Sequence, residues 1–232
     1  MKRDVRSEVC VLIPALNEEK SIGEVVRRCL IQAQGVLVMD DGSTDATAAR
    51  AREAGGDVIR CEHNRGKGAV LREGFAEVLR RGWPALIVLD GDGQHEPESI
   101  PDFVRKAGEG KAGVVIGNRM VDSGKMPPVR RWTNRIMSSL LSKLIGQRIP
   151  DTQCGFRLIS REVLDSLELT TSNYDTESEI LLQAARRGFT VASVPIKTIY
   201  LDQESKIRPG RDTIRFFRLI FRNLIGADRH RK

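Results

Sequence analysis

Short apolar runs alternate along the chain with longer segments in which apolar residues recur every three or four positions. The short runs are rich in β-branched residues and bounded by Gly, Pro, Asp or Asn, which predicts buried strands at residues 9–13, 36–39, 58–61, 86–89, 114–116 and 191–194. The longer segments predict helices over residues 21–29, 45–54, 68–81, 97–107, 130–145 and 175–187. The first helix begins with Ser21 and Glu24 at the spacing of a capping box. This alternation predicts an α/β fold in which helices cover both faces of a mostly parallel sheet.

The net charge of +7, from 38 basic and 31 acidic residues, is concentrated at one end of the chain. Residues 206–232 contain nine basic and two acidic residues, so they account for the whole excess and residues 1–205 are neutral. A neutral body with 5% aromatic residues disfavours a nucleic-acid-binding protein, which is the non-enzyme alternative. No signal peptide or membrane-spanning run is visible, and the four cysteines show no pairing pattern. These features predict a cytoplasmic protein.

Polar clusters follow five of the predicted strands. They begin at Pro14, Asp40, His63, Asp90 and Gly117. In open α/β sheets, ligands bind at the edge where the parallel strands end. The sequence therefore predicts one site, built from five loops at this edge.

The cluster Asp90-Gly91-Asp92 offers two carboxylates that can face the same side of an extended segment. Hard oxygen ligands suit Mg²⁺ or Mn²⁺, which bind few carboxylates together with substrate phosphates, and Gly91 leaves room for a phosphate. The alternative is a solvated turn, because the sequence DGDG also favours turns.

Residues 64–68, with the sequence NRGKG, open a predicted helix and contain Lys67. Free N–H groups at a helix start and a Lys ammonium can bind phosphate, although the segment also fits a plain Gly-rich turn. Asp40 and Asp41 end a strand, where paired acids suit hydrogen bonds to a ribose or a base. Capping of the next helix is the alternative, and it better explains residues 43–45.

These motifs, PALNEE at 14–19, DDGSTD at 40–45, NRGKG at 64–68 and DGDGQ at 90–94, resemble in their order a family 2 inverting glycosyltransferase of the GT-A fold. In the second half, DTQCGFR at 151–157, YDTESE at 174–179 and SKIRP at 205–209 resemble the branch of dolichyl-phosphate mannosyltransferases and dolichyl-phosphate glucosyltransferases. The resemblance covers residues 8–225 and implies a three-layer, Rossmann-like α/β/α sandwich. We predict a catalytic domain at 1–204, with a nucleotide-sugar half at about 8–120 and an acceptor half at about 121–204. A basic lid and an amphipathic helix at 205–232 would follow.

The resemblance also implies roles for single residues. The base and ribose of the donor would be held by Pro14, Leu16, Asn17, Glu18 and Asp41. The donor phosphates would lie near Lys67, Gly91, Lys206 and Arg208. Metal and diphosphate would be bound by Asp90, Asp92 and Gln94, and the groups central to catalysis would be Asp90, Asp92 and Arg119. The acceptor side would include Arg130, Arg131, Asn134, Arg157, Asp175 and Glu177. The family often has an aromatic residue before Asn17, and Leu16 in its place weakens base stacking.

The implied reaction is metal-dependent, inverting transfer of mannose or glucose from GDP-mannose or UDP-glucose to a polyprenyl (dolichyl or undecaprenyl) phosphate. A phosphate monoester is mostly dianionic at neutral pH, so the acceptor needs positioning cations more than a strong base. Asp175, Glu177 and Glu179 either orient the acceptor or form the polar face of an amphipathic helix. The alternative acceptor is a soluble sugar or a small alcohol.

A lipid acceptor requires contact with a membrane. On a helical wheel, Arg211, Arg215, Arg218 and Arg222 form one stripe, and Phe216, Phe217, Ile220, Phe221, Leu224 and Ile214 lie away from it. Residues 210–225 are therefore predicted to lie on a membrane surface, or alternatively to pack on the domain. The predicted helix at 130–145, with Trp132, is a second candidate for the interface. We expect peripheral association with the cytoplasmic face, directly or through a membrane-protein partner.

Overall fold

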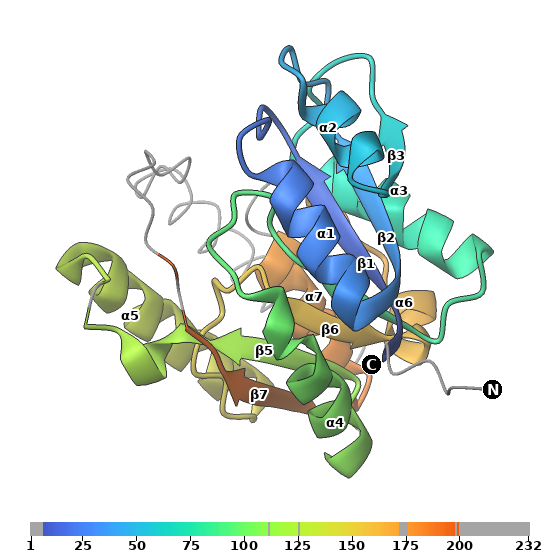
Figure 1. Ribbon diagram of the computed structural model, residues 1–232. Coiled ribbons are helices and arrows are strands. Elements are labelled where there is room, and N and C mark those ends of the chain that lie inside the picture. Colours follow the sequence, from blue (N-terminus) through green and yellow to red (C-terminus); the bar gives the residue numbers. More distant parts are fainter. Residues whose placement is uncertain (1–6, 111, 125, 172–175, 198, 200–232) are drawn as a thin grey trace.

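A computed structural model describes residues 7–110, 112–124, 126–171, 176–197 and 199 of the 232-residue chain. Its centre is a seven-stranded sheet in the order β3-β2-β1-β4-β6-β5-β7 (Figure 1). The strands are β1 (Ser7–Ala15), β2 (Ala33–Asp40), β3 (Asp57–Arg60), β4 (Ala85–Val88), β5 (Val114–Asn118), β6 (Arg157–Ser160) and β7 (Val191–Pro195). Only β6 runs antiparallel to its neighbours β4 and β5 among these strands, and the remaining pairs are parallel. The predicted mostly parallel sheet is thus confirmed.

Helices cover both faces of the sheet. One face packs against α1 (Ile22–Gln32), α2 (Thr47–Glu53) and α4 (Ile100–Gly110). The other packs against α3 (Lys67–Arg80), α5 (Pro128–Ile145), α6 (Arg161–Ser166) and α7 (Thr176–Arg186). Along β1, Val11 and Ile13 join the first cluster while Cys10 and Leu12 join the second, because successive side chains of a strand alternate between faces. The result is the expected three-layer α/β/α sandwich. Two short 3₁₀ helices, η1 (Pro97–Ser99) and η2 (Arg119–Asp122), complete the described elements.

Strand β6 was not among the predicted strands. It has four residues, and Arg157 and Ser160 flank only two apolar ones, so it lacks the continuous apolar run of a buried strand. It nevertheless lies in the middle of the sheet, between β4 and β5. The second half of the chain thus inserts a strand directly beside β4, the strand that precedes Asp90.

The predicted capping box at the start of α1 is not formed. Ser21 is the N-cap residue, but its hydroxyl makes no capping hydrogen bond to the helix. Ser21 Oγ instead donates to the carbonyl oxygen of Gly91 at 2.7 Å. The start of α1 is therefore fastened to the loop that carries the two candidate metal ligands. The backbone of Ser21 is helical (φ −112°, ψ −34°) and not extended as in most N-cap residues.

Some predictions fall on parts of the chain that the structure does not describe. They are the lid and helix at 205–232, Lys206, Arg208 and Asp175. The division into a nucleotide-sugar half and an acceptor half stays a prediction. Among the described residues, no helix combines the length and the apolar character needed to cross a bilayer.

Candidate active site

The first two strand-end loops are joined by reciprocal hydrogen bonds. The backbone N–H of Asn17 donates to Ser43 Oγ at 3.0 Å, and Asn17 Oδ1 accepts from the N–H of Thr44 at 2.9 Å. Asn17 has a φ of 54°, a left-handed conformation that Asn adopts more readily than most residues. Glu18 donates its N–H to Thr47 Oγ1 at 2.8 Å. The predicted donor-binding residues Pro14, Leu16, Asn17 and Glu18 thus lie on one ordered edge beside the loop after β2.

Asp41 holds the turn that leads into α3. Its Oδ1 accepts the N–H of Arg65 at 2.7 Å, and its Oδ2 accepts the N–H of Gly66 at 2.9 Å. Gly66 has a φ of 89°, which a residue with a side chain rarely adopts. At α2 the N-cap residue is Ala46, which has no side-chain capping hydrogen bond, and Oδ1 of the preceding Asp45 accepts from the N–H of Thr47 at 2.9 Å. Asp41 therefore fixes the direction from which Lys67, the next residue, enters the site.

Lys67 joins two carboxylates from distant parts of the chain. Its Nζ lies 2.7 Å from Oδ1 of Asp90 and 2.8 Å from Oε1 of Glu177. Burial lowers the pKa of Lys67, but the two carboxylates outweigh burial and hold it well above its usual value. Glu177 Oε2 is buried and has no hydrogen-bond partner among the described residues. The site therefore contains an ammonium held by α3, a carboxylate after β4, and a carboxylate on α7.

The carboxylate of Asp90 sits against the backbone of Gly155. A Cβ atom at Gly155 would lie 2.9 Å from Cγ of Asp90 and 3.0 Å from Oδ1, closer than non-bonded carbon and oxygen atoms approach. Burial raises the pKa of Asp90, but the Lys67 ammonium and then His95 outweigh it and hold that pKa far below its usual range. Asp90 is therefore ionised at neutral pH, in a recess that only a glycine leaves open.

Asp92 lies two residues after Asp90, and its surroundings shift its pKa in the opposite direction. Burial, followed by the charge of Asp90, raises the pKa of Asp92 above its usual value. Its Oδ1 accepts the backbone N–H of Gln94 at 3.0 Å. With Asp90, Asp92, Glu177 and Lys67 ionised, the cluster has a formal charge of −2, which one divalent cation would balance.

The two carboxylates fit a divalent cation that is completed by other ligands. Within the described part of the chain, no three or more His, Cys, Asp or Glu side chains are grouped so as to hold a metal ion by themselves. Mg²⁺ is commonly bound in this way, by one or two carboxylates, water and substrate phosphates. The hard oxygen donors of Asp90 and Asp92 and the charge of the cluster therefore suit Mg²⁺ or Mn²⁺.

The sequence offers two loop histidines as candidate ligands or bases, although most loop histidines are neither, and one of the two, His95, is a site residue. It is buried, and its Nε2 lies 3.7 Å from Oδ2 of Asp90, on the side away from Lys67. Its ring packs on Phe156, with ring centroids 5.5 Å apart. Its position three residues after Asp92, within the same loop, was the available signal. His63, the other histidine considered, has a largely exposed side chain, and its Nε2 lies 3.9 Å from Oε2 of Glu62.

A second buried cluster lies where β5 ends. Arg119 donates from Nε and Nη2 to the two oxygens of Asp151, at 2.7 and 2.9 Å. Asn134, on α5, donates to Oδ1 of Asp151 at 2.8 Å, and Ser138 donates to Asn134 at 3.1 Å. Asp151 is fully buried, and Arg119 holds its pKa below the usual range in spite of burial. Two of the predicted phosphate or acceptor ligands, Arg119 and Asn134, thus meet on one carboxylate.

The remaining predicted acceptor residues have different surroundings. Arg157 is fully buried and donates to the carbonyl oxygens of Cys154 at 2.7 Å, Thr152 at 2.6 Å and Glu177. It fastens residues 151–157 to α7, which makes it a positioning residue in this structure. Arg130 and Arg131 are half-buried in the first turn of α5. Arg131 Nε is buried and lacks a hydrogen-bond partner among the described residues.

Glu177 and Glu179 do not form a solvent-facing side of α7. Thr176, Glu177, Ser178 and Glu179 are all buried. Both oxygens of Glu179 accept hydrogen bonds from Thr170 and Thr171, so Glu179 ties α7 to the loop before it. The polar-face alternative is therefore wrong for these two residues.

A sequence-family model decides the classification. The model described as "Glycosyl transferase family 2" matches residues 10–168, which include most of β1, the Asp90 loop and β6. The chain belongs to glycosyl transferase family 2. The predicted family is thereby confirmed.

Two relatives and one solved structure show which proteins this family 2 glycosyltransferase is similar to. It is 34% identical to the polyprenol monophosphomannose synthase of Mycolicibacterium smegmatis, over 80% of this chain and 75% of that protein. It is 32% identical to a dolichyl-phosphate hexose transferase of Haloferax volcanii, over 87% of each chain. A solved structure of glucosyl-3-phosphoglycerate synthase from Mycobacterium tuberculosis, in complex with Mn²⁺, UDP-glucose and phosphoglyceric acid, aligns with a TM-score of 0.70 at 25% identity. That alignment covers 84% of this chain and 72% of the other, and it confirms the GT-A fold.

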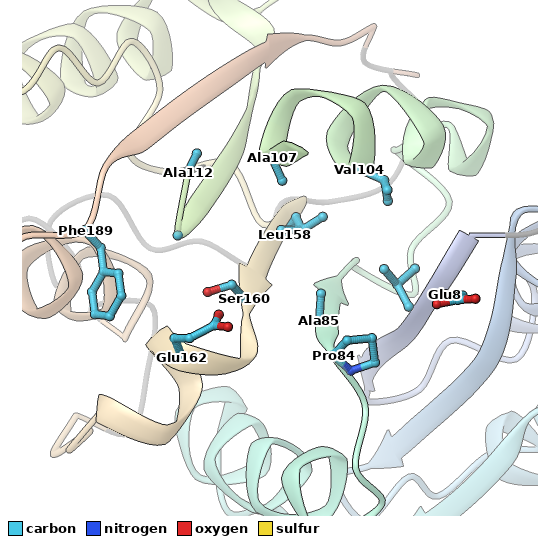
Figure 2. A pocket seen from close by; sticks show the side chains of 12 residues that line it. Glu8, Pro84, Ala85, Val104, Ala107, Ala112, Leu158, Ser160, Glu162 and Phe189 are labelled. Atoms are coloured by element: carbon cyan, nitrogen blue, oxygen red, sulfur yellow. The ribbon is translucent and has the colours of Figure 1, made fainter. Parts of the chain in front are cut away.

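A cavity of about 550 Å³ in this glycosyltransferase lies at the opposite edge of the sheet (Figure 2). It is lined by the beginnings of β1 and β4 and the end of β6, together with Val104 and Ala107 of α4. Most of the side chains drawn in Figure 2 are apolar, and Glu8 and Glu162 are its acids. None of the predicted site residues lines it, so it is separate from the edge that carries Asp90.

Proposed function

We propose that this protein transfers a hexose, mannose or glucose, from a nucleotide-diphospho-sugar to a polyprenyl phosphate, with inversion at the anomeric carbon. The observation that carries the proposal is the contact between the two motif sets. Gly155, from the segment that resembles polyprenyl-phosphate transferases, packs on Asp90, from the segment that resembles nucleotide-sugar enzymes. One site would then combine donor and acceptor functions. Relatives named for polyprenyl- and dolichyl-phosphate transfer support the same acceptor.

The donor side of the proposal is built on the Lys67 cluster. Asp90 and Asp92 would hold Mg²⁺ or Mn²⁺, with Gln94 next to them, and a bound divalent cation supplies positive charge to the leaving diphosphate. Lys67 is held at this point by Asp90 and Glu177, and it would turn toward the donor phosphates. Asp41 would keep Lys67 in place through its hydrogen bonds to Arg65 and Gly66. Lys206 and Arg208 would add positive charge from the C-terminal segment.

The acceptor side needs cations more than a base. In the proposed reaction, an oxygen of the dianionic lipid phosphate forms a bond to the anomeric carbon while the bond to the diphosphate breaks on the opposite side. The bonding electron pair leaves with the nucleoside diphosphate, and no proton has to be removed from the acceptor. Arg130 and Arg131, in the first turn of α5, would hold the acceptor phosphate. Arg119 as a phosphate ligand stays a prediction, because its Nε and Nη2 are engaged by Asp151.

The likeness to glucosyl-3-phosphoglycerate synthase favours one alternative, a soluble acceptor that also bears a phosphate. The chemistry of attack differs, because a hydroxyl acceptor needs a general base and a phosphate dianion does not. His95, whose Nε2 lies 3.7 Å from Oδ2 of Asp90, would be the candidate base in that case. The two functions therefore differ in the acceptor that supports transfer.

The location follows from the acceptor. A polyprenyl phosphate lies in a membrane, so the protein would associate peripherally with the cytoplasmic face. Residues 210–225 would contribute a basic amphipathic helix, and a membrane-protein partner would be the other means of anchoring.

Incubation with radiolabelled GDP-mannose or UDP-glucose tests the proposal. Each donor is combined with a short-chain polyprenyl phosphate or with phosphoglyceric acid, and each mixture is run with Mn²⁺ or with EDTA. We expect label in the lipid product with one donor, and its loss in EDTA. Label only in phosphoglyceric acid would establish the soluble-acceptor alternative, and transfer to neither acceptor would refute the proposed function.

A further inference from the structure

One face of α5 carries large apolar side chains that the described structure leaves uncovered. They are Val129, Trp132, Ile136 and Leu140, which are 70%, 62%, 51% and 39% exposed. Their spacing of three, four and four residues places them within about 80° of one another around the helix. We call these four residues the α5 stripe. The residues that α5 buries, which include Met137 and Leu141, lie on the opposite side of the helix.

The segment around the α5 stripe is strongly basic. Residues 123–150 contain six basic residues and no acidic ones, in a part of the chain where the two signs balance overall. Arg135, Lys143 and Arg148 are exposed. An apolar face flanked by Lys and Arg is typical of helices that lie in the plane of a membrane interface, with the apolar side chains among the lipids.

The α5 stripe is also connected to the candidate active site. Asn134, on the buried side of the same helix, donates to Asp151, which pairs with Arg119 at the end of β5. Figure 1 shows α5 beyond the end of β5, at the side of the sheet where that strand terminates. A surface that the α5 stripe touches would therefore lie next to the edge that carries the site.

We propose that the α5 stripe docks on the surface of an anionic lipid bilayer. The inference rests on the proposed function in one respect, that the acceptor lipid would be in the same bilayer. Charge decides between this occupant and two others. The segment at 206–232 has a net charge of +7 and a second copy of α5 would be equally basic, so either would face the six cations of residues 123–150 with like charge. An anionic bilayer has the complementary charge, and basic residues near such a surface are attracted to it.

Binding of the full chain to vesicles tests this proposal without the transfer reaction. The vesicles contain phosphatidylcholine with about one-third phosphatidylglycerol, or phosphatidylcholine alone, and no polyprenyl phosphate. Trp132→Glu and Ile136→Glu each place a charge in the α5 stripe and should weaken binding to the anionic vesicles roughly tenfold. Ile31→Glu is the matched control, because Ile31 is 67% exposed on α1, and it should bind as the unaltered chain does. Circular dichroism confirms that each variant is folded.

Trp132 provides a second readout. The chain has two tryptophans, so Trp83→Phe leaves the emission of Trp132 alone, and this emission should shift to the blue when anionic vesicles are added. Equal binding by the unaltered chain, Trp132→Glu and Ile136→Glu would overturn the proposal. Emission that is already blue-shifted without vesicles and does not change on their addition would mean that residues 206–232 cover α5. A molecular mass that rises with concentration and falls in Ile136→Glu would mean that a second copy does.

The same variants separate this proposal from the proposed function. With a short, water-soluble polyprenyl phosphate, Trp132→Glu and Ile136→Glu should turn over as the unaltered chain does. Failure of the unaltered chain to transfer sugar would count against the proposed function and leave the vesicle result intact. Failure of the unaltered chain to bind the anionic vesicles, while it still transfers sugar, would count against the α5 stripe and leave the proposed function intact.

Discussion

Gly155 lies so close to Asp90 that a methyl group on the glycine would overlap the aspartate carboxyl group. The two residues belong to motifs that are 65 positions apart in sequence (155 − 90), and they meet because β6 pairs directly with β4. The candidate metal ligand after β4 therefore depends on a residue that binds nothing itself.

Gly155→Ala should displace the Asp90 carboxylate, because the new Cβ would meet Cγ at 2.9 Å. We expect sugar transfer to fall by at least about 100-fold, since misplacing a reacting group by roughly an ångström has effects of this size. Steady-state kinetics at saturating donor give the measurement. Gly124→Ala is the control, because a Cβ there meets nothing within 4 Å, and its rate should be unchanged. Equal rates for the two variants would contradict the role of Gly155.

Lys67→Met should make the protein depend more on a divalent cation. The ammonium that contacts both Asp90 and Glu177 would be gone. Removing one partner of a buried ion pair lowers the free energy of unfolding by about 3 kcal/mol. The melting temperature without metal should therefore fall, and Mn²⁺ should raise it more in Lys67→Met than in the unaltered chain. Lys67→Arg, which keeps a positive charge, is the control. An equal rise with Mn²⁺ in all three proteins would show that Lys67 does not compete with the metal.

Asp92→Asn should stabilise the metal-free protein at neutral pH and abolish transfer. The pKa of Asp92 is raised in the folded state, so this carboxyl binds a proton more tightly when folded, and its ionised form costs stability above that pKa. The gain in melting temperature should therefore be present at pH 7 and shrink as the pH falls through the raised pKa. Thermal unfolding from pH 7 down to the ordinary aspartate pKa of about 3.9 gives the measurement. Near-normal transfer by Asp92→Asn would remove the argument for metal.

Asp151→Asn should destabilise the fold by about 3–5 kcal/mol, because it leaves the buried Arg119 without a counter-ion. Arg119→Met combined with Asp151→Leu should recover much of this loss, since apolar replacements of a buried pair leave no charge uncompensated. Urea unfolding measures both variants. Asp122→Asn, at an exposed position in η2, is the control and should change stability little. A small effect of Asp151→Asn would mean that water reaches Arg119.

The sheet could be predicted because parallel strands that are buried on both faces appear as continuous apolar runs. Each of the six predicted strands coincides with a strand of the structure. Strand β6 could not be found in this way, because it begins with a charged residue. Arg157 can be buried in the sheet because it donates to three carbonyl oxygens of residues outside the strand. A pattern of single residues contains no information about such partners.

The candidate site shows the same limit. The five polar clusters could be placed at one edge of the sheet, because the edge follows from strand direction alone. The contacts between individual side chains at this edge could not be predicted. Glu177 lies on α7 and reaches Lys67 on α3, and Arg119 is neutralised by an aspartate from a separate loop. His95 was set aside as an ordinary loop histidine, yet its ring is buried beside Asp90.

The Asn134 side chain gives α5 a role as a spacer. The helix presents Asn134 to the Asp151 cluster on one side and the α5 stripe on the other, and a helix with its side chains is roughly 10–12 Å across. If the α5 stripe rests in a lipid interface, the thickness of one helix sets the height of the active-site edge above the lipid. A phosphate at the end of a polyprenyl chain would then have to rise by about one helix diameter to reach the donor. Substrates buried deeper than this would be excluded by distance, before any contact with the site selects among them.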